Sequence, residues 1–402
     1  MSERIVIIGA GQAAAQAVAT LRAEGFNGEL TAVGDEPFAP YQRPPLSKAY
    51  LAGTFERERL YLKPAQFYED AKCALILDTA ASVIDRDLKF VGLSDGQHIA
   101  YDKLLLATGS RVRRIRCPGA DLDGIHYMRG MVDVDALQPE FKPGARLAVI
   151  GGGYIGLEVA AVAKKHGLQV TVFEAMDRLM QRAVTPPISA FYEKVHRDAG
   201  VTLMLNTALE AFEGGERIEA VRAGGKSYPV DLALVGIGIV PNQELAQAAG
   251  LTCDDGIVVD EFGATSDPAI FAAGDCTKHP AQHGKMVRLE CVQNAIDQAK
   301  HAALAMLGKP TPYREVPWFW SDQYDLKLQI AGLAGRGDQI VVRGDPATRK
   351  FAAFHLAQGA VVAVEAVNAA PEYLIGRKLI AAGTRVAPER LADLAISMKN
   401  MA

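Results

Sequence analysis

The sequence predicts an α/β protein with two domains built on parallel sheets and a third, smaller α+β domain. Two short apolar runs, Arg4 to Ile8 and Arg146 to Ile150, are each followed at once by a glycine-rich loop and a helical stretch. A short run that is apolar throughout is typical of a strand buried on both faces. From Pro317 the character changes to strand-rich sequence closed by a terminal helix. Two strand–loop–helix units followed by such a segment indicate this architecture.

The first unit alternates strand and helix. After the first strand, the alanine-rich stretch from Ala13 to Glu24 predicts a helix, and Gly25 is well placed to end it. Leu30 to Val33 predicts the next strand and Lys103 to Ala107 a further one. This order is typical of a βαβ unit on a parallel sheet.

A glycine loop joins the first strand to the first helix. Its sequence, Gly9-Ala10-Gly11-Gln12-Ala13-Ala14, is a GxGxxA pattern in the strand-to-helix context of dinucleotide-binding loops. Gly9 permits the tight turn, Gly11 lets backbone N–H groups approach a pyrophosphate, and Ala14 allows close helix–strand packing. An acid that would bind the ribose is expected after the second strand. Gly34 stands at the end of that strand, so the acid comes one residue late, and we favour Asp35 over Glu36.

The pattern restarts after Pro143-Gly144. Arg146 to Ile150 predicts a strand, Gly156 to His166 a helix stopped by Gly167, and Gln169 to Phe173 the next strand. The connecting loop, Gly151-Gly152-Gly153-Tyr154-Ile155-Gly156, is a full GxGxxG.

An acid ends the second strand of this unit. The carboxylate of Glu174 would accept hydrogen bonds from a ribose 2′-OH and repel a 2′-phosphate, which favours NADH over NADPH. Arg178 follows a few residues later and leaves NADPH open.

Two such loops in one chain indicate two bound dinucleotides. One glycine-rich loop can be a turn without a ligand, but two in the right context, each with its own acid, argue against that. The sequence therefore predicts two Rossmann-like dinucleotide-binding domains, one for FAD and one for a nicotinamide donor.

Charge, hydropathy and cysteine pattern exclude other classes. A net charge of −4 does not favour a general nucleic-acid or anionic-membrane binder. No stretch approaches the ~20 apolar residues of a membrane span, and no signal peptide precedes the first strand. The five cysteines are scattered without a CxxC pair, which argues against a disulfide framework and a zinc site. We expect a cytoplasmic protein without a metal.

The order of motifs resembles the glutathione-reductase-like flavoproteins. After the GxGxxA loop come Ala107-Thr108-Gly109, the GxGxxG loop, Gly236-Ile237-Gly238 and Ala273-Gly274-Asp275. Within that superfamily, the chain is similar to the oxygenase-coupled, NADH-dependent ferredoxin reductases of the putidaredoxin reductase type. Three segments carry this likeness: RPPLSK at 43–48, GGGYIGLE at 151–158 and PWFWSDQY at 317–324.

This likeness covers nearly the whole chain and implies where the cofactors bind. We expect an FAD-binding domain from 1–112 and 241–316, an NADH-binding domain from 113–240 and a C-terminal α+β domain from 317–402. The residues implied for FAD are Gly9, Gly11, Ala13, Ala14, Asp35, Arg43, Lys48, Ala81, Thr108, Gly109, Arg129, Asp275, Val292 and Trp320. Those implied for NADH are Gly151, Gly153, Tyr154, Ile155, Gly156, Glu158, Glu174 and Gly238.

The likeness also implies three catalytic residues. In the family, Lys48 and Glu158 lie beside the reactive flavin nitrogen, where they would pair and help to hold the nicotinamide. Trp320 would stack near the isoalloxazine ring. Asp275 would bind the ribityl chain. Val292 would begin a helix whose N-terminal dipole faces the pyrimidine edge of the flavin.

The cysteine pattern bears on how electrons leave. Disulfide reductases of the superfamily need a cysteine pair near the flavin, and peroxidase or oxidase relatives need one cysteine where this chain has Tyr41 to Lys48, which has none. Cys276 and Cys291 lack a partner at useful spacing, so we interpret them as packing residues. Electrons are therefore expected to leave without a thiol relay.

The implied acceptor is a small [2Fe–2S] ferredoxin serving a cytochrome P450 or an aromatic-ring dioxygenase. Such ferredoxins are acidic, so transient electrostatic docking to a basic face is expected. Lys63 and Lys300 match family positions that face the partner, and Lys327 and Arg336 are further candidates. We expect a monomer or weak dimer with no nucleic-acid or membrane partner.

Two alternatives share the fold. One is an NADH reductase of another acceptor, such as monodehydroascorbate or a quinone. The other is a signalling protein that resembles apoptosis-inducing factor, in which FAD and NADH control shape or assembly. The compact chain, without a targeting sequence or a long insertion near its end, favours the electron-transfer enzyme.

Overall fold

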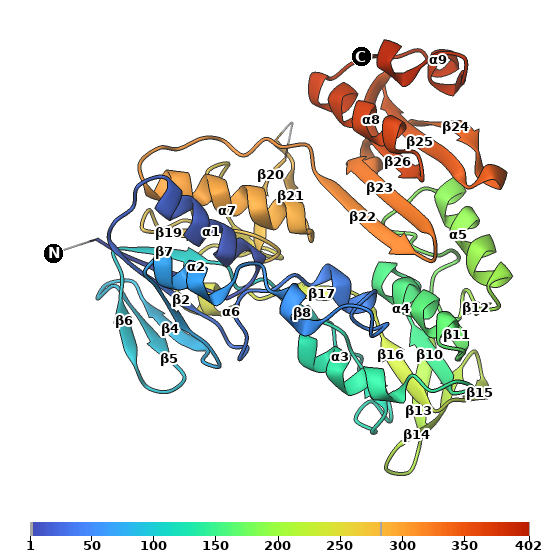
Figure 1. Cartoon of the computed structure of the whole chain (residues 1–402), viewed down its shortest axis with the longest axis horizontal. Coiled ribbons are helices and arrows are strands. Elements are labelled where there is room, and N and C mark those ends of the chain that lie inside the picture. The colour runs from blue at the N-terminus through green and yellow to red at the C-terminus, as the bar shows by residue number, and fades with distance from the viewer. Residues whose placement is uncertain (1–2, 282–283, 402) are drawn as a thin grey trace. The chain divides into compact units, whose positions relative to one another are not determined.

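The computed structural model describes residues 3–281 and 284–401, apart from the side chain of Arg336, and it divides into two compact units (Figure 1). The predicted α/β class is confirmed, whereas the predicted three-domain division stays a prediction. The first unit holds the described residues of Met1–Gln42, Arg57–Arg111 and Ile239–Glu315, and the second those of Arg43–Glu56, Val112–Gly238 and Val316–Ala402.

The first unit is built on a five-stranded parallel sheet in the order β19-β7-β1-β2-β3. Strand β1 is central: the chain continues to β2 and β3 on one side of it and later adds β7 and β19 on the other side. In open α/β sheets, ligands bind at the carboxyl edge where the strand order reverses in this way. The strands are β1 (Arg4–Ile8), β2 (Glu29–Val33), β3 (Cys73–Ile76), β7 (Lys103–Leu106) and β19 (Ile270–Ala272).

Two helices, α1 (Gln12–Ala23) and α7 (Val292–Met306), lie side by side on this sheet (Figure 1). Their buried faces are mostly alanine, which lets the helix backbones approach closely. The predicted first helix and strands agree with the observed ones to within a residue at each end. The unit also contains α2 (Ala65–Asp70), α6 (Glu244–Ala248), the antiparallel strands β4 (Ala81–Asp85), β5 (Phe90–Leu93) and β6 (His98–Ala100), and the short strands β18 (Ile257–Val258), β20 (Thr277–Pro280) and β21 (Met286–Val287).

The second unit contains another five-stranded parallel sheet, in the order β12-β11-β10-β16-β9. Its central strand β10 is again followed directly by a glycine loop and a helix. The elements are β9 (Ile125–His126), α3 (Met131–Leu137), β10 (Arg146–Ile150), α4 (Tyr154–Lys165), β11 (Gln169–Phe173), α5 (Pro186–Asp198), β12 (Thr202–Met204) and β16 (Leu232–Val235), with an antiparallel sheet of β13 (Leu209–Gly214), β14 (Ile218–Ala223) and β15 (Lys226–Pro229).

Two short strands form a separate two-stranded sheet. Strand β8 (Ser110–Val112) pairs with β17 (Ile239–Pro241). A 3₁₀ turn, η1 (Pro44–Ser47), belongs to the second unit and ends directly before Lys48.

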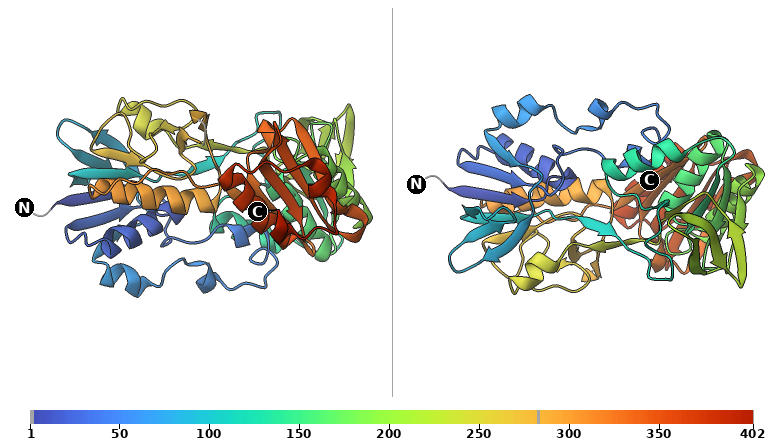
Figure 2. Two further views of the ribbon diagram at one scale, coloured as in Figure 1. Left: turned by 90° about the horizontal axis from the view of Figure 1, so that it is seen from above. Right: turned by 90° about the horizontal axis from the view of Figure 1, so that it is seen from below.

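The C-terminal part is an antiparallel sheet in the order β22-β23-β26-β25-β24. Helix α8 (Ala370–Ala382) packs on one face of this sheet (Figure 2). The expected terminal helix is two helices, because Gly383 adopts φ +61° and ends α8 before α9 (Pro388–Ala392) begins. The strands are β22 (Trp318–Gln323), β23 (Leu326–Gly332), β24 (Gln339–Asp345), β25 (Lys350–Ala357) and β26 (Ala360–Val367).

Candidate active site

The first glycine loop begins where β1 ends. Gly9 has a φ of +117°, and its N–H donates to the carbonyl of Val33 at 2.6 Å. A Cβ atom on Gly9 would overlap the carbonyl oxygen of Ala107, which directly follows the neighbouring strand β7. Only glycine combines this backbone conformation with so close an approach, so the tight turn predicted from the sequence has a steric reason.

Gly11 has a different function in the same loop. It is the N-cap of α1, with an ordinary extended backbone (φ −112°) and no side chain capping the helix. A Cβ atom on Gly11 would have no neighbour within 4 Å, so open space lies beside it. The N–H groups of the first turn, which includes Ala13 and Ala14, are therefore available to an anion such as a phosphate.

Asp275 lies close to this helix end. A Cβ atom on the preceding Gly274 would lie 3.5 Å from the Cβ of Ala13 and 3.7 Å from that of Ala295 on α7. Ser110 Oγ donates to Asp275 Oδ2 at 2.8 Å. The fold thus brings the Ala-Gly-Asp motif together with the start of α1 and the first turns of α7.

Helix α7 is anchored to the same motif. Gln298, which is buried on α7, accepts the N–H of Gly274 and the hydroxyl of Thr277, both at 2.8 Å. Val292 is the first residue of the helix, and the side chain of the N-cap residue, Cys291, makes no capping hydrogen bond. The N-terminal dipole of the helix is therefore available to a ligand beside Asp275.

Thr108 and Gly109 shape the end of β7. Thr108 Oγ1 donates to the carbonyl of Asn242 at 2.6 Å, and Asn242 returns a bond from Nδ2 to the carbonyl of Thr108 at 2.9 Å. Gly109 has a φ of +64°. The Ala-Thr-Gly strand end is thus bonded to the chain segment that contains Asn242.

The acid after β2 is displaced for a steric reason. The residue directly after the strand is Gly34, and a Cβ atom there would overlap the Cβ of Ala10 in the glycine loop. Asp35, the next residue, is exposed, whereas Glu36 accepts a short hydrogen bond from Tyr41. Ala81, the first residue of β4, is half-buried.

The second glycine loop repeats the geometry of the first. Gly151 has a φ of +105°, and a Cβ atom there would overlap the carbonyl oxygen of Gly236. A Cβ atom on Gly156 would overlap the carbonyl oxygen of Gly151, whereas Gly153 has open space. Gly153 is the N-cap of α4, which no side chain caps. This loop therefore also presents backbone donors to an open region.

Three other predicted NADH residues flank this loop. Tyr154 begins α4, and its ring centroid lies 4.6 Å from that of Phe319. Ile155 is 43% exposed, which is unusual for a large apolar side chain near a buried strand. Gly238 has a φ of +106° and open space for a Cβ atom.

Glu174 lies at the end of β11 and contacts the loop. Its Oε2 accepts the N–H of Gly152 at 2.6 Å, and its Oε1 accepts the N–H of Met176 at 2.8 Å. Arg178 points its guanidinium at the carbonyls of Val184 and Gln181, at 2.7 and 2.9 Å. Arg178, the residue that kept NADPH as an alternative, therefore donates its hydrogen bonds to carbonyls of its own loop.

Lys48 and Glu158 form the ion pair that the family likeness implied. Lys48 Nζ lies 2.6 Å from Glu158 Oε2, and the glutamate side chain is only 2% exposed. Ser47 Oγ also donates to Oε2 at 2.5 Å, and Ser321 Oγ donates to Oε1 at 2.6 Å. A buried carboxylate with one cation and two hydroxyl donors is held in a single orientation.

The remaining predicted FAD residues of the second unit are Arg43, Arg129 and Trp320. Arg43 donates to the carbonyl of Arg129 at 2.8 Å. Trp320 on β22 is half-buried, and its ring centroid lies 5.6 Å from that of Trp318. The FAD candidates therefore occur in both units, and all NADH candidates occur in the second.

Comparison with known proteins shows the family of this chain. Residues 3–299 match the family described as pyridine nucleotide-disulphide oxidoreductase, and residues 318–402 match the reductase C-terminal family. Rhodocoxin reductase from Rhodococcus erythropolis is 45% identical over 98% of this chain and 93% of its own length. Putidaredoxin reductase from Pseudomonas putida is 40% identical over 100% and 97%. The chain belongs to the ferredoxin reductases of this family.

Solved ferredoxin reductases share the whole fold. The covalent putidaredoxin reductase–putidaredoxin complex matches with a TM-score of 0.97 and 40% identity, over 99% of this chain and 98% of that chain. The ferredoxin reductase for the CYP199A2 system from Rhodopseudomonas palustris also matches with a TM-score of 0.97 and 40% identity, over the full length of both chains. The resemblance predicted from the motifs is confirmed, and the chain is an oxidoreductase of a family that uses a flavin and NAD(P)H.

The cysteines of this ferredoxin reductase are poor redox groups. All five are free. Burial raises the pKa of Cys276, and burial also raises the pKa of Cys291 to about 11. Because the thiolate is the reactive form, these thiols stay protonated and unreactive near neutral pH, as expected for packing residues.

The basic residues predicted to face a partner are exposed where their side chains are described. Lys63 and Lys300 are exposed in the first unit and Lys327 in the second. The side chain of Arg336 lies outside the described part of the structure.

Sequence reasoning missed the residues that orient the predicted ones. Ser47 and Ser321 donate to Glu158, Ser110 donates to Asp275, and Gln298 holds Gly274. Ser47 and Ser321 lie inside the motifs RPPLSK and PWFWSDQY, next to Lys48 and Trp320. A serine beside a predicted catalytic residue could have indicated them.

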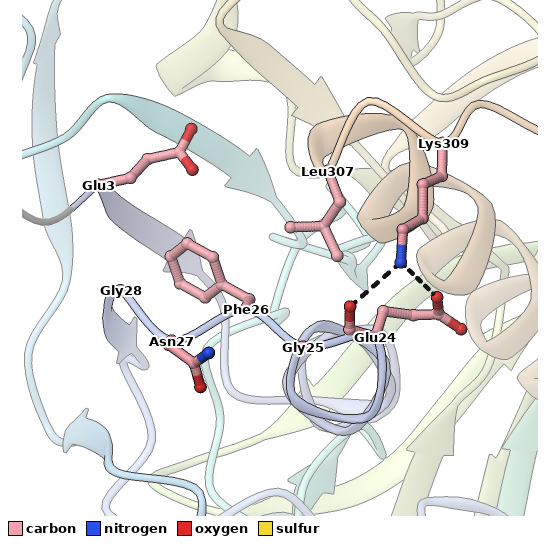
Figure 3. Close-up of a pocket in the computed structure, with 8 residues that line it drawn as sticks. All are labelled: Glu3, Glu24, Gly25, Phe26, Asn27, Gly28, Leu307 and Lys309. Atoms are coloured by element: carbon pink, nitrogen blue, oxygen red, sulfur yellow. Dashed lines mark hydrogen bonds and ion pairs between the residues drawn. The ribbon is translucent and has the colours of Figure 1, made fainter.

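A pocket at the other end of the first sheet is separate from this site. Figure 3 shows Phe26 and Leu307 lining it and Lys309 bonded to Glu24. It also includes Glu3, which directly precedes β1, whereas Gly9 follows that strand. Among residues 3–281 and 284–401, no helix is long and apolar enough to cross a membrane, and no acidic, histidine or cysteine side chains cluster as metal ligands do.

Proposed function

We propose that this chain is an FAD-containing NADH:ferredoxin oxidoreductase. It takes a hydride from NADH and passes single electrons to a [2Fe–2S] ferredoxin that serves a cytochrome P450 or a ring-hydroxylating dioxygenase. The observation that carries the proposal is the presence, in one ferredoxin reductase-like chain, of two glycine loops that each leave open space at an uncapped helix end.

The residues of the first unit fit FAD. Gly11 leaves room for a pyrophosphate at the start of α1, and Asp275 offers a carboxylate for ribityl hydroxyls beside the uncapped start of α7. In the second unit, Lys48 and Trp320 would hold the reactive part of the cofactor. When bound, FAD supplies the chemistry that links a two-electron donor to one-electron acceptors.

The second loop fits NADH better than NADPH. Glu174 holds Oε2 at the glycine loop through Gly152, where a ribose would lie, and Oε1 at the N–H of Met176. Its negative charge would repel a 2′-phosphate. Arg178, the nearby cation that could have bound that phosphate, donates instead to two carbonyls of its loop.

Lys48 and Glu158 would orient the nicotinamide. Because Glu158 is buried and bonded to two serine hydroxyls, the charges of the pair are positioned before the dinucleotide arrives. Such preorganisation lowers the cost of bringing two rings together.

The acceptor is proposed to be a ferredoxin because Cys276 and Cys291, whose pKa values are raised by burial, offer no relay and the relatives are ferredoxin reductases. Exposed lysines such as Lys63, Lys300 and Lys327 would attract an acidic partner. We propose a transient complex, formed in the cytoplasm by a monomeric or weakly dimeric enzyme.

The proposed function is tested by following electrons through the purified protein. The flavin absorbance should bleach on addition of NADH, and reduction of cytochrome c should accelerate when an acidic [2Fe–2S] ferredoxin such as putidaredoxin is added. The acceleration should decline as salt screens the docking charges. Bleaching without any ferredoxin-dependent acceleration would favour another acceptor or a signalling protein.

Replacing Glu174 with alanine should relax the choice of nicotinamide cofactor. We expect KM for NADH to rise about tenfold while KM for NADPH falls or stays unchanged, because the ribose acceptor and the repulsive charge are lost together. Steady-state kinetics with both donors measure the ratio. Asp177→Ala, which removes an exposed carboxylate from the same loop, is the matched control. An equal rise for both donors would indicate loop disorder and contradict the ribose assignment.

A further inference from the structure

The carboxylate of Glu158 is the end of a buried hydrogen-bond chain that runs through the C-terminal sheet. Ser321 Oγ lies 2.6 Å from Glu158 Oε1, and Gln323 Nε2 lies 3.2 Å from Ser321 Oγ. His196 Nε2 lies 2.8 Å from Gln323 Oε1, and the hydroxyl of Tyr324 lies 3.1 Å from His196 Nδ1. Ser321, Gln323 and His196 are all fully buried.

The direction of every bond in this chain follows from its end at Glu158. An ionised carboxylate only accepts, so the single proton of Ser321 points to Glu158. Ser321 Oγ must then accept from Gln323, which places the amide nitrogen toward the serine and the amide oxygen toward His196. His196 Nε2 therefore carries a proton.

The other end of the chain is fixed by burial. Burial lowers the pKa of His196 to about 4, so the ring is neutral near pH 7 and its Nδ1 carries a lone pair. Tyr324, whose pKa burial raises, keeps its proton and donates it to Nδ1. Four donors in a row thus point the same way, toward Glu158. Such chains strengthen each bond by polarisation.

We propose that Ser321 is a positioning residue for hydride transfer, and that Gln323, His196 and Tyr324 hold it in the donating orientation. Ser321 acts on Oε1 of Glu158 and leaves Oε2 to Lys48 and Ser47, so the ammonium group is held at one place. This inference rests on the proposed function, because it assumes that Lys48 and Glu158 orient the nicotinamide.

The first test is whether the orientation of Glu158 affects hydride transfer. Ser321→Ala should lower the limiting rate constant for flavin bleaching by NADH about tenfold, while Kd for NAD⁺ changes less than twofold. Gln323→Met, which keeps the side-chain volume but donates nothing, should act in the same direction and serves if Ser321→Ala does not fold. Ser189→Ala is the control, because Ser189 is equally buried but donates to the carbonyl of Leu179. Wild-type bleaching in both Ser321→Ala and Gln323→Met, or an equal loss in Ser189→Ala, would overturn the proposal.

The second test needs no activity. In ¹⁵N-histidine-labelled protein, the signal that disappears in His196→Phe should show the neutral tautomer protonated at Nε2 and bare at Nδ1 at pH 7. In Gln323→Met this tautomer should no longer be fixed. An imidazolium, or a proton on Nδ1 in the wild type, would overturn the direction of the chain. The tautomer can be read even if NADH fails to bleach the flavin, so failure of the proposed function and failure of this inference are distinguishable.

Discussion

Replacing Lys48 with methionine should slow the bleaching of the flavin by NADH about a hundredfold, which is the size of effect expected when one preorganised charged donor is lost. Methionine keeps the length of the side chain and removes only the ammonium group. The structural reason is that Glu158, with 2% of its side chain exposed, would keep its negative charge and lose the ammonium group 2.6 Å from its Oε2. Stopped-flow absorbance measures the rate constant directly.

The same change should also destabilise the protein, because removing one partner of a buried pair leaves an uncompensated charge and costs about 3 kcal/mol. The double variant Lys48→Met with Glu158→Gln removes both charges, so it should regain most of the lost thermal stability without regaining the rate. If Lys48→Met bleached at the wild-type rate and unfolded at the wild-type temperature, Lys48 would be an ordinary surface lysine.

The second large effect should come from filling the open space at either glycine loop. Gly11→Val should give a folded protein without bound FAD, because its Cβ meets no protein atom within 4 Å and its backbone already has a conformation that valine favours. Gly153→Val should keep FAD and lose NADH binding for the same steric reason. Affinity for NAD⁺ should fall about a hundredfold in that variant, as when two or more backbone–phosphate hydrogen bonds are lost.

Each of these variants is the control for the other. Flavin absorbance after purification, circular dichroism and titration with NAD⁺ separate loss of one cofactor from loss of the fold. If both variants kept both cofactors, the open spaces beside Gly11 and Gly153 would not be phosphate sites.

The positions of helices and strands could be predicted from the sequence where they depend on local residue patterns. After their first residue, the strands Arg4–Ile8 and Arg146–Ile150 are apolar because both faces of a central parallel strand are covered, and glycines mark the turns that follow. Helix and strand ends near those glycines were predicted to within about two residues, the normal uncertainty of helix boundaries. The break between α8 and α9 was missed, although Gly383 marks it.

The site was only partly readable. Lys48 and Glu158 were paired through the family likeness, since no local pattern joins residues 110 positions apart. Ser321 reaches Glu158 across 163 positions and His196 reaches Gln323 across 127, so these partners depend on how the sheets pack and not on any periodicity. The displaced acid after β2 was visible in the sequence, but its cause, the overlap between positions 10 and 34, required coordinates.

The overlap at the two glycine loops also constrains how either loop can change. In the first loop Ala10 faces Gly34, and in the second Gly152 faces Glu174, so each pair of positions holds one side chain. A glutamate at position 34 would collide with Ala10, and an alanine at position 152 would press on Glu174. If the two positions of a pair are substituted one after the other, the first substitution has to be to glycine. The resulting variant has glycine at both positions and lacks both the methyl group and the carboxylate. Engineers who wish to move cofactor preference between the loops should change the two positions together.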